Sequence, residues 1–392
     1  MVERLSQLAA IVDELIEVQE RLQSFVPDRL RPCLTQESIT ARGTLVIGPR
    51  GTGKTTFLLA QAMEKKLMYL SADSPLVSQV GLWDLGREVF KRDFSGLIID
   101  EVHFAPDWSR DLKALYDAYP RKIIVASDSS SVILRKGVSD LSRRFIKIQI
   151  PFLSFRDFVF LKEGITLPVL NFQEPDQRSV QKVLNTGPIL HWFKIYMNTG
   201  LRPFFLEGDY RERQLNIIEK TIFSDLPFLL PQINENILRL GNAVIGMLAL
   251  SSVPTINVES TCRDWNVGKD TFYNLLAALE AISLIRIVDF KKTSKSKSKG
   301  AKILFSDSSH YAVLGGNPGN AREAYVAWEL EQHFGEVYAS KDEKKGDFTA
   351  GGLVFEVGGA SKKVKEADLV LCDDLELPVG KKRPLWMMGL RE

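Results

Sequence analysis

The segment TLVIGPRGTGKTT holds the residues whose chemistry is easiest to name. It contains the spacing G-x-x-x-x-G-K-[ST], in which the glycines let backbone N–H groups curl around phosphate oxygens. Lys54 is then placed to reach the outer phosphate oxygens, and Thr55 to ligate Mg²⁺. A strand pattern precedes the loop and a helical pattern follows it, so the positive end of that helix would face the anion. We predict a site for ATP and Mg²⁺ formed by Gly48, Pro49, Arg50, Gly51, Thr52, Gly53, Lys54, Thr55 and Thr56.

Two adjacent acids follow a second apolar run, SGLIIDE. Asp100 would emerge at the carboxyl end of a buried strand, which is where open α/β sheets bind their ligands. Beside the phosphate loop, Asp100 is suited to hold Mg²⁺, and Glu101 to polarise an attacking water. Two acids that only cap a strand end are the simpler alternative, which the phosphate loop upstream disfavours.

Two further signals lie later in the same region. KIIVASDSS ends a strand in polar residues, of which Ser127 could lie near the γ-phosphate or could belong to a simple helix cap. LSRRFIKI places Arg143 and Arg144 at a helix end just before a strand. Arginines there could reach a neighbouring subunit's nucleotide as a finger, or could complement a helix C-terminus. We expect Arg144 to act as the finger.

The elements that must position these residues can be read from the hydrophobic pattern. From about residue 43 to residue 150, the runs TLVIG, LMYLSA, GLIIDE, KIIVAS and RFIKIQI alternate with helical patterns. Such alternation predicts an α/β fold with a mostly parallel, doubly wound sheet. The next stretch, to about residue 240, is aromatic-rich and lacks a series of strands, so we expect it to be helical.

A compact unit of helices and a hairpin is expected next. VESTCRDWNV and GKDTFYNLLAALEAISLI have the pattern of two helices joined at Gly268, and IRIVDF and KILFSD have the pattern of a hairpin. That outline is typical of a winged helix. The tip of the hairpin is rich in lysine and serine, which suits sequence-independent contacts to DNA phosphates. The predicted DNA-binding residues are Lys269, Lys291, Lys292, Lys295, Lys297 and Lys299. The alternative is a solvated loop on a module that binds only proteins.

The motifs GPRGTGKTT, IIDEVHFAPDWSRDLKALYD, IIVASDSSS, LSRRF and PFLSFRDF together resemble the AAA-type ATPase domain of a large prokaryotic family. The resemblance covers nearly the whole chain and implies ATP hydrolysis and a ring or other oligomer. It assigns the P-loop and Walker B roles, and those of sensor and finger, to Lys54, Thr55, Asp100, Glu101, Ser127 and Arg144. Two positions depart from the family pattern, because Asp128 stands in place of a glycine and Arg143 precedes Arg144 in place of a glycine.

The same family carries a C-terminal domain of unknown function, which is similar to the restriction-endonuclease-like fold. Its metal-binding acids would correspond here to Glu323 in the helix AREAYVAWELEQHF, Asp347, and Glu356 in the strand LVFEV. Further strands are expected at ADLVLC and PLWMM. The lysine expected two residues after the strand glutamate is replaced by Gly358, and Lys362 and Lys363 lie beyond a flexible glycine turn. We therefore expect a nuclease-like domain that does not cut.

Composition limits the remaining possibilities. The chain has 392 residues, of which 45% are hydrophobic and 26% charged, as in soluble globular proteins of more than one domain. Its net charge of +2 means that any affinity for nucleic acid depends on local patches. The 3 cysteines are too few for a disulfide framework, and no apolar run approaches the roughly 20 residues that span a bilayer. We expect a cytoplasmic protein with no membrane partner.

These observations predict five regions. They are an N-terminal helical segment (1–40), an AAA-type P-loop domain (41–155), a helical lid (156–237), a winged helix with a basic wing (238–302) and an inactive restriction-endonuclease-like domain (303–392). The expected function is an ATPase that binds ATP, ADP and Mg²⁺ and performs work on DNA as a homo-oligomer. Two alternatives stay open: an ATP-gated signalling or assembly switch whose C-terminal half binds protein, and an ATP-regulated metal-dependent nuclease.

Overall fold

The computed structural model describes residues 2–129, 141–230, 233–252, 254–291, 301–341, 345–362 and 366–391. They belong to two compact units, Met1–Pro151 and Phe152–Glu392, and each is described by itself. The five-region division remains a prediction. The wing residues Lys292, Lys295, Lys297 and Lys299 lie outside the described residues.

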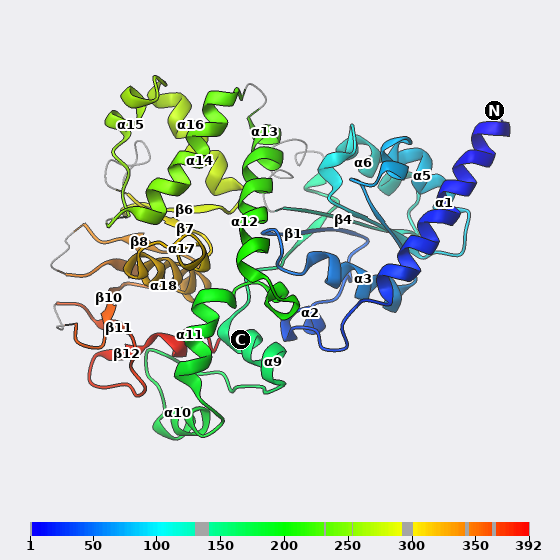
Figure 1. Ribbon diagram of the computed structural model, residues 1–392. Helices are drawn as coiled ribbons and strands as arrows, with labels where there is room; N and C mark the ends of the chain where they lie inside the picture. Colours follow the sequence, from blue (N-terminus) through cyan, green and yellow to red (C-terminus); the bar gives the residue numbers. More distant parts are fainter. Residues whose placement is uncertain are drawn as a thin grey trace. The chain divides into compact units, whose positions relative to one another are not determined.

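The first unit consists of helices and strands in alternation (Figure 1). In chain order its elements are α1 (Val2–Gln23), α2 (Pro32–Gln36), β1 (Gly43–Gly48), α3 (Lys54–Lys65), β2 (Leu67–Ser71), α4 (Pro75–Ser78), α5 (Leu82–Phe90), β3 (Gly96–Asp100), η1 (Val102–Phe104), α6 (Trp108–Ala118), β4 (Ile123–Ser129) and β5 (Ile146–Gln149).

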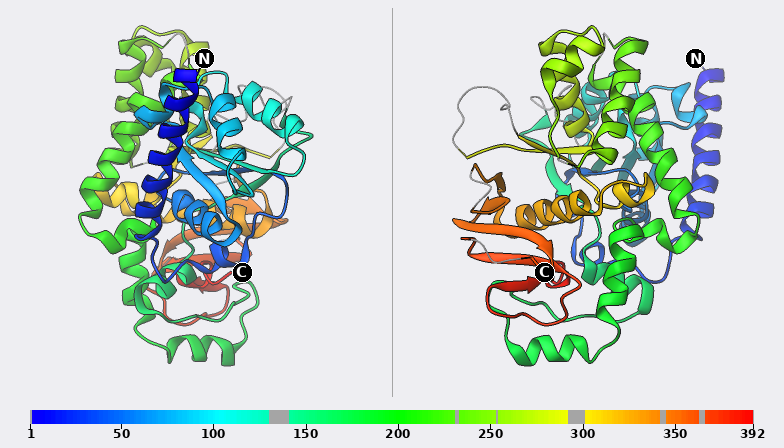
Figure 2. Two further views of the ribbon diagram at one scale, coloured as in Figure 1. Left: turned by 90° about the vertical axis from the view of Figure 1, so that its right-hand side faces the viewer. Right: turned by 60° about the vertical axis from the view of Figure 1, so that its left-hand side comes forward.

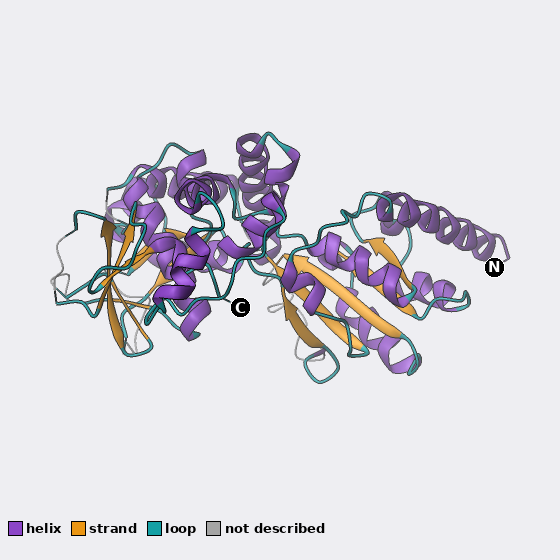
Figure 3. Ribbon diagram, turned by 90° about the horizontal axis from the view of Figure 1, so that it is seen from below, coloured by secondary structure: helices purple, strands orange, loops and turns teal. Residues whose placement is uncertain are grey.

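A five-stranded sheet forms the centre of this unit, with the order β2-β3-β4-β1-β5. All neighbouring strands pair in parallel. Alternate side chains of β1 enter different cores, because Leu45 packs with residues of α1, α5 and α6, whereas Val46 packs with residues of α2 and α3. Figure 3 shows helices on both sides of these strands. The predicted doubly wound α/β sheet is confirmed, and all five strands occur where the apolar runs predict them.

Helix α1 closes one edge of this sheet with a single side chain. The Gln19 amide donates a hydrogen bond to the Leu67 carbonyl at 3.1 Å and accepts one from the Tyr69 N–H at 2.8 Å. Strand β2 is an edge strand, so these backbone groups would otherwise face no partner strand. Gln19 is buried, and its amide offers one donor and one acceptor to β2 as a neighbouring strand would.

The second unit begins with helices and ends in a sheet. Its helices are α9 (Phe155–Glu163), α10 (Gln177–Leu184), α11 (Ile189–Thr199), η2 (Pro203–Glu207), α12 (Tyr210–Lys220), η3 (Thr221–Asp225), α13 (Leu226–Leu229), α14 (Glu235–Leu250), α15 (Val258–Asp264), α16 (Lys269–Ala281), α17 (Ser309–Val313), α18 (Pro318–Phe334) and η4 (Leu385–Met387). Its strands are β6 (Ile285–Val288), β7 (Lys302–Phe305), β8 (Tyr338–Ala339), β9 (Phe348–Ala350), β10 (Leu353–Gly359), β11 (Leu369–Asp373) and β12 (Lys382–Pro384).

Helices α14, α15 and α16 precede a two-stranded antiparallel hairpin of β6 and β7. The predicted helical face of α16 is buried, including Phe272, Leu275 and Leu279. Helix α18 packs against β7 of the hairpin and also against β9 and β10 of the terminal sheet, as Figure 2 illustrates. A bridge between Phe290 and Ala339 further ties the end of β6 to strand β8. The hairpin is therefore connected to the terminal sheet in two ways, through α18 and through this bridge.

The terminal sheet has the order β12-β11-β10-β9-β8 and mixes parallel with antiparallel pairs. The prediction that PLWMM is a strand is wrong. The strand β12 ends at Pro384, and Leu385–Met387 forms a buried 3₁₀ turn. Proline has no N–H to continue a ladder, and a short apolar run cannot by its pattern distinguish a buried strand from a buried turn.

No helix within the described ranges is long and apolar enough to cross a membrane.

Candidate active site

The glycine-rich loop connects β1 to α3 as the sequence predicts. Gly53 has a φ of 96°, in the left-handed region that glycine adopts without strain, and this turn directs the chain into α3. A Cβ on Gly48 would lie only 2.2 Å from the Ile150 carbonyl oxygen, so the close approach of the chain after β5 requires glycine there. The N-terminus of α3 consequently points its first N–H groups toward the loop.

Two cationic side chains donate hydrogen bonds to backbone carbonyls of the loop. The Lys54 ammonium donates to the carbonyls of Gly48 at 2.8 Å and Pro49 at 3.1 Å, and burial lowers the pKa of this lysine against the pull of nearby acids. Arg31, in the segment before α2, donates to the carbonyls of Thr52 at 3.2 Å and Pro151 at 2.8 Å. A phosphate that enters the loop would offer Lys54 a better acceptor than these neutral carbonyls, because charge-assisted hydrogen bonds are the stronger ones.

The Asp100 carboxylate lies at the carboxyl end of β3 and accepts hydrogen bonds from three other elements. Thr55 Oγ1 donates to it at 2.7 Å and the Tyr69 hydroxyl at 2.9 Å. The Ser127 hydroxyl from β4 also donates to Asp100. Burial, followed by the charge of Asp100, raises the pKa of Tyr69, so its phenol stays protonated as a donor. Thr55 and Asp100 together offer the oxygen ligands that Mg²⁺ prefers.

Glu101 has left-handed backbone angles, with a φ of 48° and a ψ of 47°. Its N–H is bonded by Asp100 Oδ1 at 3.0 Å and by Ser127 Oγ at 3.4 Å, which fixes this unusual conformation. Its carboxylate faces Arg50 of the loop, with Nη1 and Oε1 3.3 Å apart. Burial raises the pKa of Glu101, opposed by Arg50 and Lys54. A carboxylate with a raised pKa next to a phosphate site is suited to general-base catalysis.

A buried imidazole connects the ends of β3 and β4. His103 Nδ1 lies 3.0 Å from Asp128 Oδ2, and 3.7 Å from Glu101 Oε2. Nitrogen and oxygen atoms of these three residues all lie within 4.8 Å of one another. Asp128, which stands where the resembled family has glycine, is thus part of a polar network that reaches Glu101.

Arg144 does not join the predicted site within its own chain. Its guanidinium forms a two-pronged ion pair with Asp117, with both N–O distances 2.9 Å. Its carbonyl lies beside Gly43, at the amino end of β1, whereas the phosphate loop follows the carboxyl end at Gly48. At about 3.3 Å per residue, the length of β1 separates the two by roughly 17 Å. Arg143 is exposed.

The acids predicted in the C-terminal domain converge around lysines. Lys302 Nζ of β7 lies 2.6 Å from Glu323 Oε2 and 3.1 Å from Asp347 Oδ1. Lys362 Nζ lies 2.8 Å from Glu356 Oε1, and the charge of Lys362 also reaches Glu323, whose pKa burial raises. Lys302 thus joins two members of the predicted trio, Glu323 and Asp347, and the sequence did not reveal it as their partner. Glu356 pairs with a different lysine, and among the described residues the three acids do not form a cluster that could hold a metal ion.

The predicted DNA-contacting lysines that the structure describes are both near acids. Lys269, the first residue of α16, lies 3.2 Å from Glu259 on α15, and both are exposed. Lys291 follows the hairpin strand β6 and lies 3.9 Å from Glu336. Surface pairs of this kind are weak and exchange readily with other anions.

Sequence reasoning missed Arg31, Tyr69 and His103. The partners of Arg31 and Tyr69 at the site lie 21 and 31 positions away along the chain, and nothing in the local sequence distinguishes Arg31 from a surface residue. The one available signal was the placement of Tyr69 in the run LMYLSA, since a phenol in a buried strand needs a partner for its hydroxyl.

Comparisons with known proteins find a family model that matches part of the chain and several solved structures of similar fold. A family model described as an AAA domain matches residues 40–159. Among solved structures, a Walker-type ATPase of Pyrococcus abyssi has 15% identity and a TM-score of 0.43, covering 72% of this chain and 94% of that one. DnaA of Aquifex aeolicus bound to AMPPCP has 16% identity and a TM-score of 0.25, covering 63% and 84%. A RuvB variant of Thermotoga maritima has 14% identity and a TM-score of 0.28, covering 71% and 88%.

A comparison with curated proteins gives no match. The family match covers the segment that holds the phosphate loop, the five parallel strands and the acids at their carboxyl ends. This part of the chain is an AAA-type P-loop ATPase domain, and the protein is an ATP-hydrolysing enzyme.

Proposed function

We propose that this ATPase couples the binding and hydrolysis of Mg²⁺-ATP to conformational work on DNA, acting as an oligomer. The observation that supports the proposal most is the convergence of Lys54, Thr55, Asp100 and Glu101 at one edge of a parallel sheet. The same chain carries a helical module with a lysine-rich hairpin, which supplies a surface for an anionic polymer.

Each residue of the site has a distinct part in this proposal. Lys54 and the loop N–H groups bind the β- and γ-phosphates, and Thr55 and Asp100 hold the magnesium ion. Magnesium bound there supplies positive charge to the phosphate oxygens. Glu101 polarises the attacking water, and Ser127 keeps Asp100 and the Glu101 N–H in place.

Loss of Lys54 or of the Glu101 charge should have separable effects. We expect Lys54→Ala to abolish turnover, because it removes the cation that binds the outer phosphates. Glu101→Gln should lower kcat by about 100-fold or more while ATP still binds, because the amide cannot accept the water's proton. Steady-state phosphate release and equilibrium ATP binding measure the two effects.

The matched controls are Lys65→Ala and Glu64→Gln, both on α3 away from the loop. They should turn over as the unsubstituted enzyme does. Full activity in Lys54→Ala or Glu101→Gln would refute the assignment of the site.

Arg144 is proposed to complete the site of a neighbouring subunit. Its position at the amino edge of the sheet keeps it from its own phosphate loop, so any action on nucleotide must occur in trans. Its ion pair with Asp117 is partly exposed, with 27% and 49% of the two side chains accessible, and such a pair costs little to exchange.

Two inactive variants should therefore rescue each other. Arg144→Ala keeps Glu101 but offers no finger, whereas Glu101→Gln offers Arg144 but no base. We expect their mixture to hydrolyse ATP faster than the sum of the separate proteins, measured as phosphate release at constant total concentration. The control Arg143→Ala changes the exposed neighbouring arginine, and this variant should hydrolyse ATP normally without being mixed with another variant. A mixture that shows only the summed activity would exclude a finger at Arg144.

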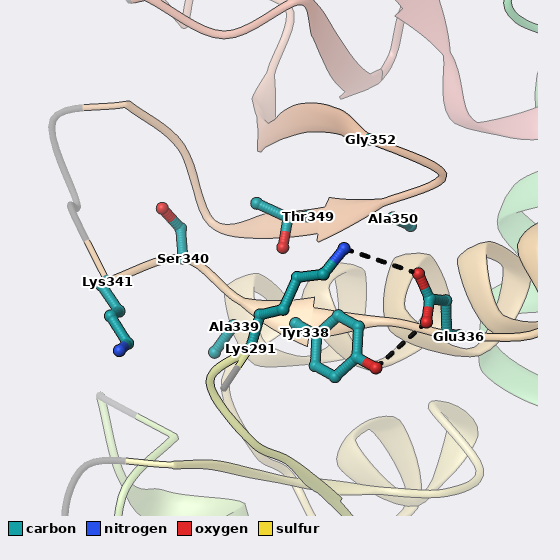
Figure 4. A pocket seen from close by; sticks show the side chains of 9 residues that line it. All are labelled: Lys291, Glu336, Tyr338, Ala339, Ser340, Lys341, Thr349, Ala350 and Gly352. Carbon is teal, nitrogen blue, oxygen red and sulfur yellow. Dashed lines mark hydrogen bonds and ion pairs between the residues drawn. The ribbon is translucent and has the colours of Figure 1, made fainter. Parts of the chain in front are cut away.

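The winged-helix assignment for α14 to α16 and the hairpin belongs to the same proposal. A hollow of about 310 Å³ lies beside β8 and β9, where the chain leaves the end of β6. Figure 4 shows Lys291 extending across it toward Glu336, which also accepts a hydrogen bond from the Tyr338 hydroxyl at 3.0 Å. Since Glu336 offsets the charge of Lys291, we propose that the lysines of the hairpin tip make most of the phosphate contacts.

Removal of the tip lysines should weaken DNA binding at every sequence. We expect Lys295→Ala, Lys297→Ala and Lys299→Ala combined to reduce the slope of log K against log[salt] by roughly 2 to 3, since each phosphate contact contributes about 0.9. Fluorescence anisotropy with a labelled duplex between low and moderate salt measures this.

The charge-matched control replaces Lys182, Lys194 and Lys220, which are exposed on helices α10, α11 and α12. It should leave the slope unchanged. Equal slopes for the two triple variants would favour the alternative in which the C-terminal half binds protein and hydrolysis resets a signalling or assembly switch.

A metal-dependent nuclease is the second candidate function, and the position of Lys362 favours it. A Cβ on Gly358 would lie 2.6 Å from Lys362 Cδ. The side chain of Lys362 therefore fills the space that a side chain at residue 358 would occupy, and its ammonium contacts Glu356. Lys302 opposes the candidate, because its ammonium already balances the charge of Glu323 and Asp347. A metal ion bound by these acids would have to displace Lys302.

We expect plasmid DNA to stay intact with Mg²⁺ or Mn²⁺, because Lys302 holds the acids. The assay compares the unsubstituted protein with Lys302→Met, which vacates the position between the acids, and with Glu356→Ala. Cleavage that Glu356→Ala removes would establish the second candidate and refute the inactive domain.

A further inference from the structure

The ion pair of Arg50 and Glu101 joins the phosphate loop to the proposed general base. The two side chains are only 11% and 18% exposed, and Nη1 of Arg50 lies 3.3 Å from Oε1 of Glu101. Charge-assisted pairs of arginine with carboxylates are usually shorter, about 2.7–2.9 Å, and often two-pronged. The pair is therefore shielded from water, and its N–O distance is longer than that of a tight arginine–carboxylate pair.

Hydrogen bonds hold the backbone of Glu101 and part of the phosphate loop. The Glu101 N–H is bonded to Asp100 and Ser127, and its left-handed conformation is set by these bonds at the ends of β3 and β4. Arg50 lies in the loop between Gly48 and Gly53, where the neighbouring Thr52 is held through its carbonyl by Arg31. A ligand that enters the loop can therefore separate Arg50 from Glu101 by moving side chains, with the Glu101 backbone held in place.

A nucleotide changes the competition for Arg50. Arg50 belongs to the loop that surrounds phosphates, its guanidinium pairs with Glu101, and its charge acts on Lys54. Since Lys54 reaches the outer phosphates, we infer that the Arg50 guanidinium lies near the terminal one. A terminal phosphate offers two oxygens to the planar guanidinium and more negative charge than one carboxylate oxygen, and arginine binds phosphates in this two-pronged way. ADP ends one phosphate earlier and offers no such acceptor at that place.

We propose that Arg50 is a latch that holds Glu101 until a γ-phosphate takes the guanidinium away. In this view Arg50 distinguishes ATP from ADP, and the same exchange frees the Glu101 carboxylate to polarise water only when there is a bond to hydrolyse. The proposal rests on the proposed role of Glu101. It makes Arg50 a specificity-determining residue and, through Glu101, a positioning residue.

The latch predicts a defined pattern of nucleotide affinities. Isothermal titration with Mg²⁺ and either ADP or a non-hydrolysable ATP analogue is compared for the unsubstituted protein, Arg50→Met, Glu101→Gln and the double variant. Arg50→Met should weaken the analogue by roughly 10- to 100-fold, as for a lost hydrogen bond to a charged group, and ADP by less than about threefold. Glu101→Gln should tighten the analogue, because the competing charge is gone, and this gain should disappear in the double variant.

Further variants separate the latch from a structural role. Arg50→Lys keeps the charge without the two-pronged geometry and should give intermediate affinity for the analogue. Arg110→Met, on a side chain that is 74% exposed, should change neither affinity. Equal weakening of ADP and analogue in Arg50→Met, or a gain from Glu101→Gln that persists in the double variant, would overturn the latch.

The latch and the site assignment fail in different ways. If Lys54→Ala loses turnover but the affinities of the Arg50 variants show no preference for the analogue, only the latch is wrong. If Lys54→Ala hydrolyses ATP normally, the site assignment itself is wrong, whatever the Arg50 variants do.

Discussion

The arrangement of the ATPase unit depends on the hydrogen bonds that the buried Asp100 carboxylate accepts. Thr55 from the start of α3, Tyr69 from β2 and Ser127 from β4 all donate to it, and its own chain adds the Glu101 N–H. A carboxylate that is 2% exposed would be costly without such donors, because burial penalises its charge. One side chain thus fixes the spacing between the ends of three strands and the helix that begins at the phosphate loop. The same bonds bring Thr55 and Glu101, which carry proposed roles in ATP hydrolysis, to one edge of the sheet.

In the second unit, a lysine balances the charge of two partly buried acids. Lys302 belongs to the hairpin strand β7 but places its ammonium between Glu323 of α18 and Asp347 before β9. The charges of the two acids raise the pKa of Lys302, although burial opposes them, so the lysine remains charged. The hairpin, the long helix and the terminal sheet consequently share one electrostatic cluster. If DNA bound to the hairpin in the proposed function displaced β7, the contacts of Lys302 with Glu323 and Asp347 would change.

The parts of this structure that follow from the sequence are those set by short-range pattern. The phosphate loop, the five strands and the helix after the loop are each specified within about 12 residues by glycine spacing and buried apolar runs. The residues that complete the site are distant in sequence and come together only in the folded chain. Arg31 and Tyr69 are recruited from separate elements, and Gln19 reaches a strand 48 residues away. The strand predicted at Leu385–Met387 failed because burial and strand formation leave the same local pattern.

The side chain of Gln19 also has a consequence for how the protein is made. Its helix is synthesised before β2, whose backbone it bonds at a separation of 48 residues. At about 5–20 residues per second, a ribosome needs roughly 2–10 seconds to deliver that strand after the helix. When β2 emerges, the group that closes its outer edge has already been made. The order of synthesis thus favours early protection of a strand edge that could otherwise pair with a second nascent chain.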